Sequence, residues 1–159
     1  MYYQPASLIL TQANAMGYAP KFFGVDGMDG ILTMEGFDPK LAEGVMLLTP
    51  FNADATDEKT ASFVKKYKEQ FGETPNQFAA DAYDCIYALR DALEQAGVTA
   101  DMDYSDICDA LVETFTSEDF SFTGLTTAGE SATWSDTGEI SKQPMGMVIQ
   151  DGVYMPLDA

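Results

Sequence analysis

Short apolar segments alternate with helical segments over the first half of the chain, and this order limits the fold more than any other feature. The two apolar runs are KFFGV at residues 21–25 and GVMLLT at residues 44–49. The second run is apolar without alternation, which favours a strand buried on both faces of a parallel sheet over a half-exposed strand. Strands separated by helices in this way predict an α/β protein.

Amphipathic patterns predict helices over residues 4–16, 57–71, 76–96 and 105–115. On the first of these, Ile9, Ala13 and Met16 fall on one face. The longest segment repeats apolar residues at spacings of three and four, which is typical of a helix that buries one stripe. That stripe comprises Phe78, Ala82, Ile86, Leu89 and Leu93. Toward the C-terminal end, turn signals at 136–138 and 151–152 separate short apolar segments and predict strands and hairpins.

Composition excludes several classes of function. The chain of 159 residues carries 8 basic and 26 acidic side chains, a formal net charge of −18. A surface this negative repels nucleic-acid phosphates and anionic lipids, so we expect neither as a partner. The absence of histidine removes Ser-His-Asp and Cys-His catalytic systems and the commonest metal ligand. We therefore expect no catalytic residue, no metal, no cofactor and no enzymatic activity.

Three residues are candidates for ligand contact, and each has a structural alternative. Asp26 lies between glycines at the carboxyl end of the first apolar run, where open parallel sheets bind ligands. The alternative is that it caps the helical turn that follows. Tyr3 precedes a helix that starts with proline, and it either joins the core or presents its hydroxyl at the strand end. Phe78 begins the long stripe and belongs either to the core or to a pocket. The glycines do not match the G-x-G-x-x-G dinucleotide fingerprint.

An ordered set of short motifs spans nearly the whole chain. The motifs are Tyr2-Tyr3-Gln4-Pro5-Ala6, Gly24-Val25-Asp26-Gly27, Ala42-Glu43-Gly44-Val45, Thr49-Pro50-Phe51, Phe63-Val64-x-x-Tyr67-x-x-x-Phe71-Gly72-x-x-Pro75, Phe78-Ala79-Ala80-x-Ala82-Tyr83-Asp84, Gly124 and the turn 134–138. In this order they resemble the C-terminal half of branched-chain amino-acid-binding proteins, the type I (Leu/Ile/Val-type) solute-binding proteins of ABC importers.

The resemblance implies a type I periplasmic-binding-protein fold, with two Rossmann-like, three-layer α/β lobes joined by three crossings. Residues 1–50 would belong to lobe two and residues 51–145 to lobe one, while residues 146–159 would form the last strand, returning to lobe two. The first halves of both lobes would lie outside this sequence. The resemblance also implies that Tyr3 and Asp26 face the cleft between the lobes, and that Asp26 receives the α-ammonium group of an amino acid. Phe78 would line the side-chain pocket.

Cys85 and Cys108 are expected to lie close together, because consecutive helices joined by a short connection usually pack as neighbours. The extracytoplasmic location implied by the resemblance permits their oxidation. Two outcomes are equally expected. The pair forms a disulfide, or the two residues are buried free thiols that act as small apolar side chains.

The expected function is therefore that of the extracytoplasmic solute-binding component of an ABC importer, in the periplasm or as a cell-surface lipoprotein. It would capture a small amino acid, of the branched-chain type, between two closing lobes, and its partners would be that ligand and the importer's membrane subunits. The alternative is the ligand-binding sensor domain of a receptor or regulator with the same fold. We also expect the separate chain to self-associate, as a homodimer, through apolar faces that the remaining half would cover.

Overall fold

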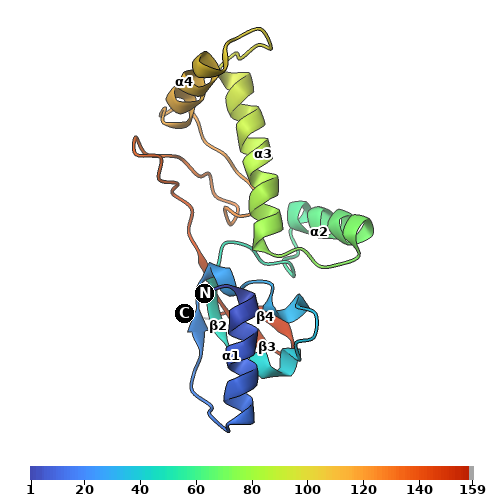
Figure 1. Cartoon of the computed structure of the whole chain (residues 1–159). Coiled ribbons are helices and arrows are strands. Elements are labelled where there is room, and N and C mark those ends of the chain that lie inside the picture. Colours follow the sequence, from blue (N-terminus) through green and yellow to red (C-terminus); the bar gives the residue numbers. More distant parts are fainter. Residues whose placement is uncertain (158–159) are drawn as a thin grey trace. The chain divides into compact units, whose positions relative to one another are not determined.

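A computed structural model describes residues 1–157 of the chain (Figure 1). These residues fall into two compact units. Unit 1 comprises residues 1–79 together with the segment from Pro144 onward, and unit 2 comprises residues 80–143. The lobe boundaries expected near residues 50 and 146 divide the chain differently and stay a prediction.

Unit 1 is built on a four-stranded sheet in the order β1-β2-β3-β4. Its strands are β1 (Phe23–Gly24), β2 (Met46–Thr49), β3 (Met145–Gln150) and β4 (Val153–Pro156). β1 and β2 are parallel, whereas β3 is antiparallel to both β2 and β4. The β3–β4 hairpin turns at Asp151 and Gly152, both with positive φ, as in the type I′ turns that fit strand twist. The strands predicted near residues 21–25 and 44–49 and the hairpin at 151–152 are confirmed, with β1 and β2 shorter than expected and the sheet mixed rather than wholly parallel. The hairpin predicted around 136–138 is reduced to an isolated bridge between Trp134 and Ile140.

The core of unit 1 joins α1 (Tyr3–Ala15) to the sheet (Figure 1). Leu10 of α1 belongs to one buried cluster with Leu47 of β2 and with Met147 and Ile149 of β3. Those three sheet residues are fully buried. Complete burial of such side chains stabilises a fold by roughly 1.5–3 kcal/mol each, so this cluster supplies much of the stability of unit 1.

The buried face of α1 differs from the predicted one. Ala13 is buried as expected, but Ile9 is 42% exposed and Met16 is 72% exposed. Ala6, Leu10 and Ala13 form the buried face instead, because their spacing of four and three residues places them in one row along the helix. The sheet selects this row, in which two small alanines flank a single leucine.

Short 3₁₀ turns and a second helix complete unit 1. The turns are η1 (Asp26–Met28), η2 (Ile31–Thr33) and η3 (Pro39–Ala42). α2 (Glu58–Phe71) begins after Asp57, whose carboxylate accepts a hydrogen bond from the Thr60 N–H at 2.9 Å. It ends at Gly72, which has the positive φ typical of a helix C-terminus. The helix predicted over 57–71 is confirmed.

α3 (Gln77–Gln95) begins in unit 1 and continues into unit 2, where α4 (Tyr104–Phe115) follows. Both helices were predicted, but the apolar stripe of α3 is not its buried face. Ile86 is 67% exposed and Leu89 is 40% exposed. The buried positions recur every four residues and are small or polar: Ala80, Asp84, Ala88 and Ala92. The expectation of a buried stripe is wrong for residues 1–157, which leave that face of α3 uncovered.

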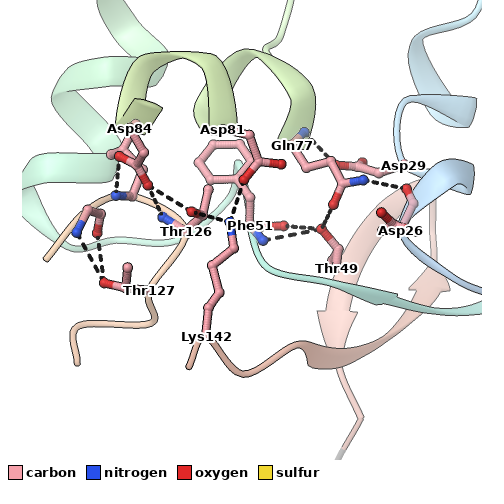
Figure 2. Close-up of polar contacts among 12 residues, drawn as sticks. Asp26, Asp29, Thr49, Phe51, Gln77, Asp81, Asp84, Thr126, Thr127 and Lys142 are labelled. Atoms are coloured by element: carbon pink, nitrogen blue, oxygen red, sulfur yellow. Dashed lines mark hydrogen bonds and ion pairs between the residues drawn. The ribbon is translucent and has the colours of Figure 1, made fainter. Parts of the chain in front are cut away.

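Asp84 ties α3 to a loop of unit 2 (Figure 2). Its buried carboxylate accepts hydrogen bonds from the N–H groups of Leu125 and Thr126 and from the Thr126 hydroxyl, each at 2.8 Å. Gly124 passes so close that an added Cβ would lie within 2.5 Å of the carboxylate atoms. We call these four residues the Asp84 clamp, because one buried anion holds three donors of the loop.

Candidate ligand-binding site

The three residues expected to contact a ligand all lie in unit 1, each at the start of a helical element. Tyr3 is the first residue of α1, Asp26 is the first residue of η1, and Phe78 is the second residue of α3. These three residues are far apart in the sequence. Contacts among the three helix starts bring the segments that carry them close together.

The η1 turn lies directly against the N-terminal end of α1. A Cβ added to Gly27 would lie 2.8 Å from the carbonyl oxygen of Met1 and 3.6 Å from the Cα of Tyr2. The first distance is a steric clash with backbone, so only glycine fits at position 27 without a shift. This glycine allows the residue before it, Asp26, to stand beside the start of α1.

Aromatic side chains flank this corner. The rings of Tyr2 and Phe78 lie with their centroids 6.1 Å apart at an interplanar angle of 41°, a separation usual for interacting aromatic pairs, and both residues are exposed. Tyr3 is half-buried and packs against the core of unit 1, with its ring beside Gly30. The structure therefore pairs Phe78 with Tyr2, a residue not selected from the sequence, while Tyr3 contacts the core.

Asp26 combines a fixed backbone with an available side chain. Its carbonyl oxygen accepts hydrogen bonds from the Asp29 N–H at 2.9 Å and from Gln77 Nε2 at 2.7 Å. Asp26 is exposed, and within residues 1–157 its carboxylate has no hydrogen-bond or ion-pair partner. Its N-cap alternative is not what the structure shows, since Asp26 is itself the first residue of η1 and Val25 precedes it as the cap. An unpaired carboxylate on a held backbone is suited to bind a cation.

A polar cluster, which we call the Gln77 hub, adjoins Asp26. It comprises the buried residues Gln77, Asp29 and Thr49, which Figure 2 shows, and the half-buried Tyr154. The backbone N–H of Gln77 donates to Asp29 Oδ2 at 2.6 Å, and the Thr49 hydroxyl lies 3.3 Å from Gln77 Oε1. The Tyr154 hydroxyl accepts from the Gly30 N–H at 3.3 Å. Burial and, next, the charge of Asp29 raise the pKa of Tyr154 well above its ordinary value. This phenol is therefore neutral across the physiological range.

Sequence reasoning missed the hub, although it left a weak signal. Thr49 is the single hydroxyl residue of an otherwise apolar strand, and Gln77 is a polar residue at the first position of a long helix. Each is also explained by its position at an element's end, where polar residues are common. Only the fold shows that both are almost completely buried, at 1% exposure each, and that they contact one another.

Other features of the described residues do not include the three expected ligand contacts. A cavity of about 240 Å³ is lined by Asp29, Gly30, Asn76 and Tyr154 among others, but by none of the three expected ligand contacts. Within residues 1–157, no three His, Cys, Asp or Glu side chains are grouped as a metal site would require. The same residues include no helix with the length and apolar character that crossing a membrane requires.

Cys85 and Cys108 are free thiols in the structure, and both residues are exposed. They line one apolar groove of unit 2 together with Phe115 and Trp134. The two cysteines share that groove, as expected of neighbours on consecutive helices. The structure holds neither the disulfide nor the burial foreseen for them, because the face that carries both thiols is uncovered. Whether they oxidise stays a prediction.

An unpaired carboxylate on a turn that follows a strand of an α/β unit, with exposed aromatic residues on the neighbouring helix starts, is typical of a ligand-binding protein. Comparison with known families agrees with this class. The periplasmic binding protein family matches residues 1–147, and the chain belongs to that family. No curated protein matches the chain.

Solved structures of similar proteins share the fold. The leucine binding protein LivK of Thermotoga maritima is 25% identical with a TM-score of 0.71, and the match covers 99% of this chain and 42% of that one. LivJ of Streptococcus pneumoniae, solved with isoleucine, is 23% identical with a TM-score of 0.74, covering 97% and 41%. A solute binding protein of Rhodopseudomonas palustris, solved with benzoate, is 15% identical with a TM-score of 0.74, covering 96% and 39%.

These matches confirm the expected type I periplasmic-binding-protein fold. The chain spans about two fifths of the length of the structures it matches, so it is a partial representative of that fold.

Proposed function

We propose that the chain is the C-terminal portion of an extracytoplasmic solute-binding protein of an ABC importer, and that Asp26 binds the α-ammonium group of a small amino acid. The observation that supports this is the exposed, unpaired carboxylate of Asp26. It stands on a turn that contacts the backbone of Tyr2, whose ring pairs with that of Phe78. A desolvated ammonium group requires a carboxylate partner, and hydrogen bonds between charged groups contribute roughly 1.5–3 kcal/mol each. The aromatic rings suit an aliphatic side chain, which favours a branched-chain ligand.

In this proposal the protein binds and delivers its ligand without catalysing a reaction. Residues 1–50 and 146–159 belong to lobe two, residues 51–145 belong to lobe one, and the lobes close by hinge motion. Tyr3 supports the cleft wall from the core side. The partners are the amino acid and the membrane subunits of the importer, outside the cytoplasm in the periplasm or on a lipoprotein anchor. A homodimer is expected only of the separate chain.

Exposed apolar side chains support the view that a longer protein completes the fold. On α1, Leu8 is 66% exposed, and on the edge strand β1, Phe23 is 60% exposed. Ile86 of α3 is exposed to a similar extent. Soluble proteins rarely leave extended apolar faces open to water. The remaining three fifths of the matched structures' length is available to cover them.

The test is a pair of substitutions in the longer protein that carries this chain, titrated with L-leucine and L-isoleucine by calorimetry. Asp26→Ala is expected to weaken binding by about 2–5 kcal/mol, because a desolvated ammonium group loses its counter-charge. Asp109→Ala removes the same charge from an exposed position on α4 and is expected to leave the affinity unchanged. Equal affinity of the Asp26→Ala variant and the parent would remove Asp26 from the site.

Benzoate serves as a second probe, since one similar protein was solved with it and it has no ammonium group. If an amino acid is the ligand, the parent binds leucine or isoleucine more tightly than benzoate, and Asp26→Ala reduces the ratio of the Kd for benzoate to the Kd for leucine. If the parent binds benzoate more tightly and Asp26→Ala leaves or improves that binding, the ligand is a carboxylate without an amine, and the proposal fails in its ligand class.

A further inference from the structure

We infer that Gln77 is a positioning residue for the ligand site, holding the peptide unit of Asp26 through its side-chain amide. The inference rests on the proposed function, because it gives Gln77 a role only if Asp26 contacts the ligand. Gln77 does not face the ligand corner as an exposed group, since it is 1% exposed. Its effect on binding would pass entirely through Asp26.

The first observation is the contact itself. Gln77 Nε2 donates to the carbonyl oxygen of Asp26 at 2.7 Å, and the same oxygen accepts from the Asp29 N–H at 2.9 Å. Two donors of good length fix the orientation of a peptide carbonyl. The carbonyl belongs to the same residue as the exposed carboxylate, so its orientation also sets the direction in which the Asp26 side chain leaves the backbone.

The second observation is that Gln77 has further hydrogen-bond contacts of its own, through its side-chain oxygen and its backbone N–H. Its Oε1 lies 3.3 Å from the Thr49 hydroxyl, and its backbone N–H donates to Asp29 Oδ2 at 2.6 Å. The Thr49 hydroxyl in turn accepts from the Phe51 N–H at 3.2 Å. A side chain fixed at both ends can restrain its partner, whereas a solvated glutamine would lose that restraint to side-chain entropy.

The third observation is which segments the amide joins. Gln77 starts α3, Thr49 ends β2, and Asp26 starts η1, and all three lie in unit 1 (Figure 2). With the lobe boundary proposed at residue 50, Gln77 belongs to lobe one and Asp26 to lobe two, so in the proposed function this hydrogen bond is a contact of the closed lobes. The ligand acid is thus tied to the end of the strand after which the chain leaves the sheet.

The experiment uses the same longer protein and L-leucine as the probe. Gln77→Met keeps the length of the side chain and removes the donor to Asp26, and Gln95→Met makes the same change at the exposed C-terminal end of α3. Loss of one hydrogen bond predicts an increase in Kd of about 3- to 10-fold for Gln77→Met. Gln95→Met is expected to leave Kd unchanged.

A double-mutant cycle that combines Gln77→Met with Asp26→Asn separates a positioning role of Gln77 from a general loss of structure. The titrations extend to millimolar leucine, because the Asp26→Asn variants are expected to bind weakly. If Gln77 acts through Asp26, the Gln77→Met effect falls below about twofold in the Asp26→Asn background, because the coupled partner is gone. An undiminished effect there, or no effect in the parent background, overturns the inference. If instead Asp26→Asn alone leaves leucine binding intact, the proposed site has failed, whatever Gln77 does.

Should Gln77→Met fail to fold, Gln77→Leu takes its place in the same cycle. It removes the donor to Asp26 and cannot supply another one, since its side chain is aliphatic. The expected rise in Kd is at least as large as for Gln77→Met, and a variant that folds with parental affinity for leucine contradicts the positioning role.

Discussion

Units 1 and 2 build their buried apolar groups from different elements. In unit 1, the fully buried residues include large apolar side chains from a turn and from two strands: Ile31, Leu47, Met147 and Ile149. In unit 2, the large buried side chains of Phe120, Phe122 and Leu125 come from the segment that follows α4. Its helix α3 buries only alanines and one aspartate, and Ile86 and Val112 on its helices are 67% and 64% exposed. The sheet of unit 1 is therefore part of a closed apolar cluster, whereas the helices of unit 2 leave apolar side chains exposed.

The Gln77 hub of unit 1 and the Asp84 clamp of unit 2 also differ in the chemical group at their centre. The Gln77 hub in unit 1 is organised by a neutral amide next to the apolar cluster, and it adds specificity to a core that already exists. The Asp84 clamp in unit 2 is organised by a buried anion that satisfies two backbone donors and a hydroxyl. The same helix, α3, is thus held through a neutral side-chain amide at its N-terminal end and through a buried carboxylate near its middle.

The largest expected effect is loss of the unit 1 cluster. Leu47→Ala should lower the free energy of unfolding by about 3–5 kcal/mol, because Leu47 is fully buried and its truncation leaves a cavity. Ile86→Ala, on the uncovered face of α3, should change it by less than about 0.5 kcal/mol. Urea denaturation followed by far-UV circular dichroism measures both. A cost for Ile86→Ala as large as that for Leu47→Ala would show that the face is covered in solution, as in a homodimer.

The second effect concerns the Asp84 clamp. Asp84→Ala leaves three donors without their acceptor and should destabilise unit 2 by about 2–3 kcal/mol. Asp84→Asn keeps one oxygen acceptor and should lose less. Trp134 is the single tryptophan of the chain and packs on Phe115 and Phe120 in unit 2, so its fluorescence reports this unit. An unchanged tryptophan transition in Asp84→Ala would contradict the structural role of the clamp.

Local pattern in the sequence was sufficient to find most of the helices and strands and to select Asp26 as the candidate ligand contact, which stays a prediction. Apolar runs bounded by turn residues located β1 and β2, and glycine after the last apolar position located the end of α2. The position of Asp26 after a strand located the corner, because strand ends in α/β sheets are where backbone and side chains converge. Each of these features depends on residues close together along the chain.

Burial and contact partners could not be predicted, because they depend on what packs against an element. The stripe on α3 was interpreted as core, yet Ala88 and Ala92 are buried while Ile86 and Leu89 are not. Periodicity shows that a helix has an apolar side and does not show whether the chain in hand covers it. The Gln77 hub was missed for a related reason, since Thr49 and Gln77 are separated by a loop and a helix in the sequence and meet only in the fold.

The smallest expected effect compares two helix starts, one in each unit. Asp57 caps α2 through a hydrogen bond from the Thr60 N–H, whereas Asp103 precedes α4 without a side-chain capping bond. Asp57→Ala should therefore destabilise the chain by about 1 kcal/mol, and Asp103→Ala should have a smaller effect. Urea denaturation at neutral pH measures the two variants side by side, and equal costs would contradict the assigned caps.

The Asp57 contribution should also depend on pH. The hydrogen bond from the Thr60 N–H lowers the folded-state pKa of Asp57 below its ordinary value of 3.8. A lowered folded-state pKa means that the cap stabilises the chain fully above the unfolded-state pKa, and that this stabilisation is lost as the pH falls through the folded-state pKa.

The difference in stability between the parent and Asp57→Ala should consequently be constant from pH 7 to about pH 5 and shrink below about pH 4. Because Asp57 is exposed, raising the ionic strength should change the difference only slightly, since a local hydrogen bond and not a distant charge produces it. A difference that persisted undiminished at the lowest pH at which the chain folds would show that Asp57 stabilises α2 by some means other than its ionised carboxylate.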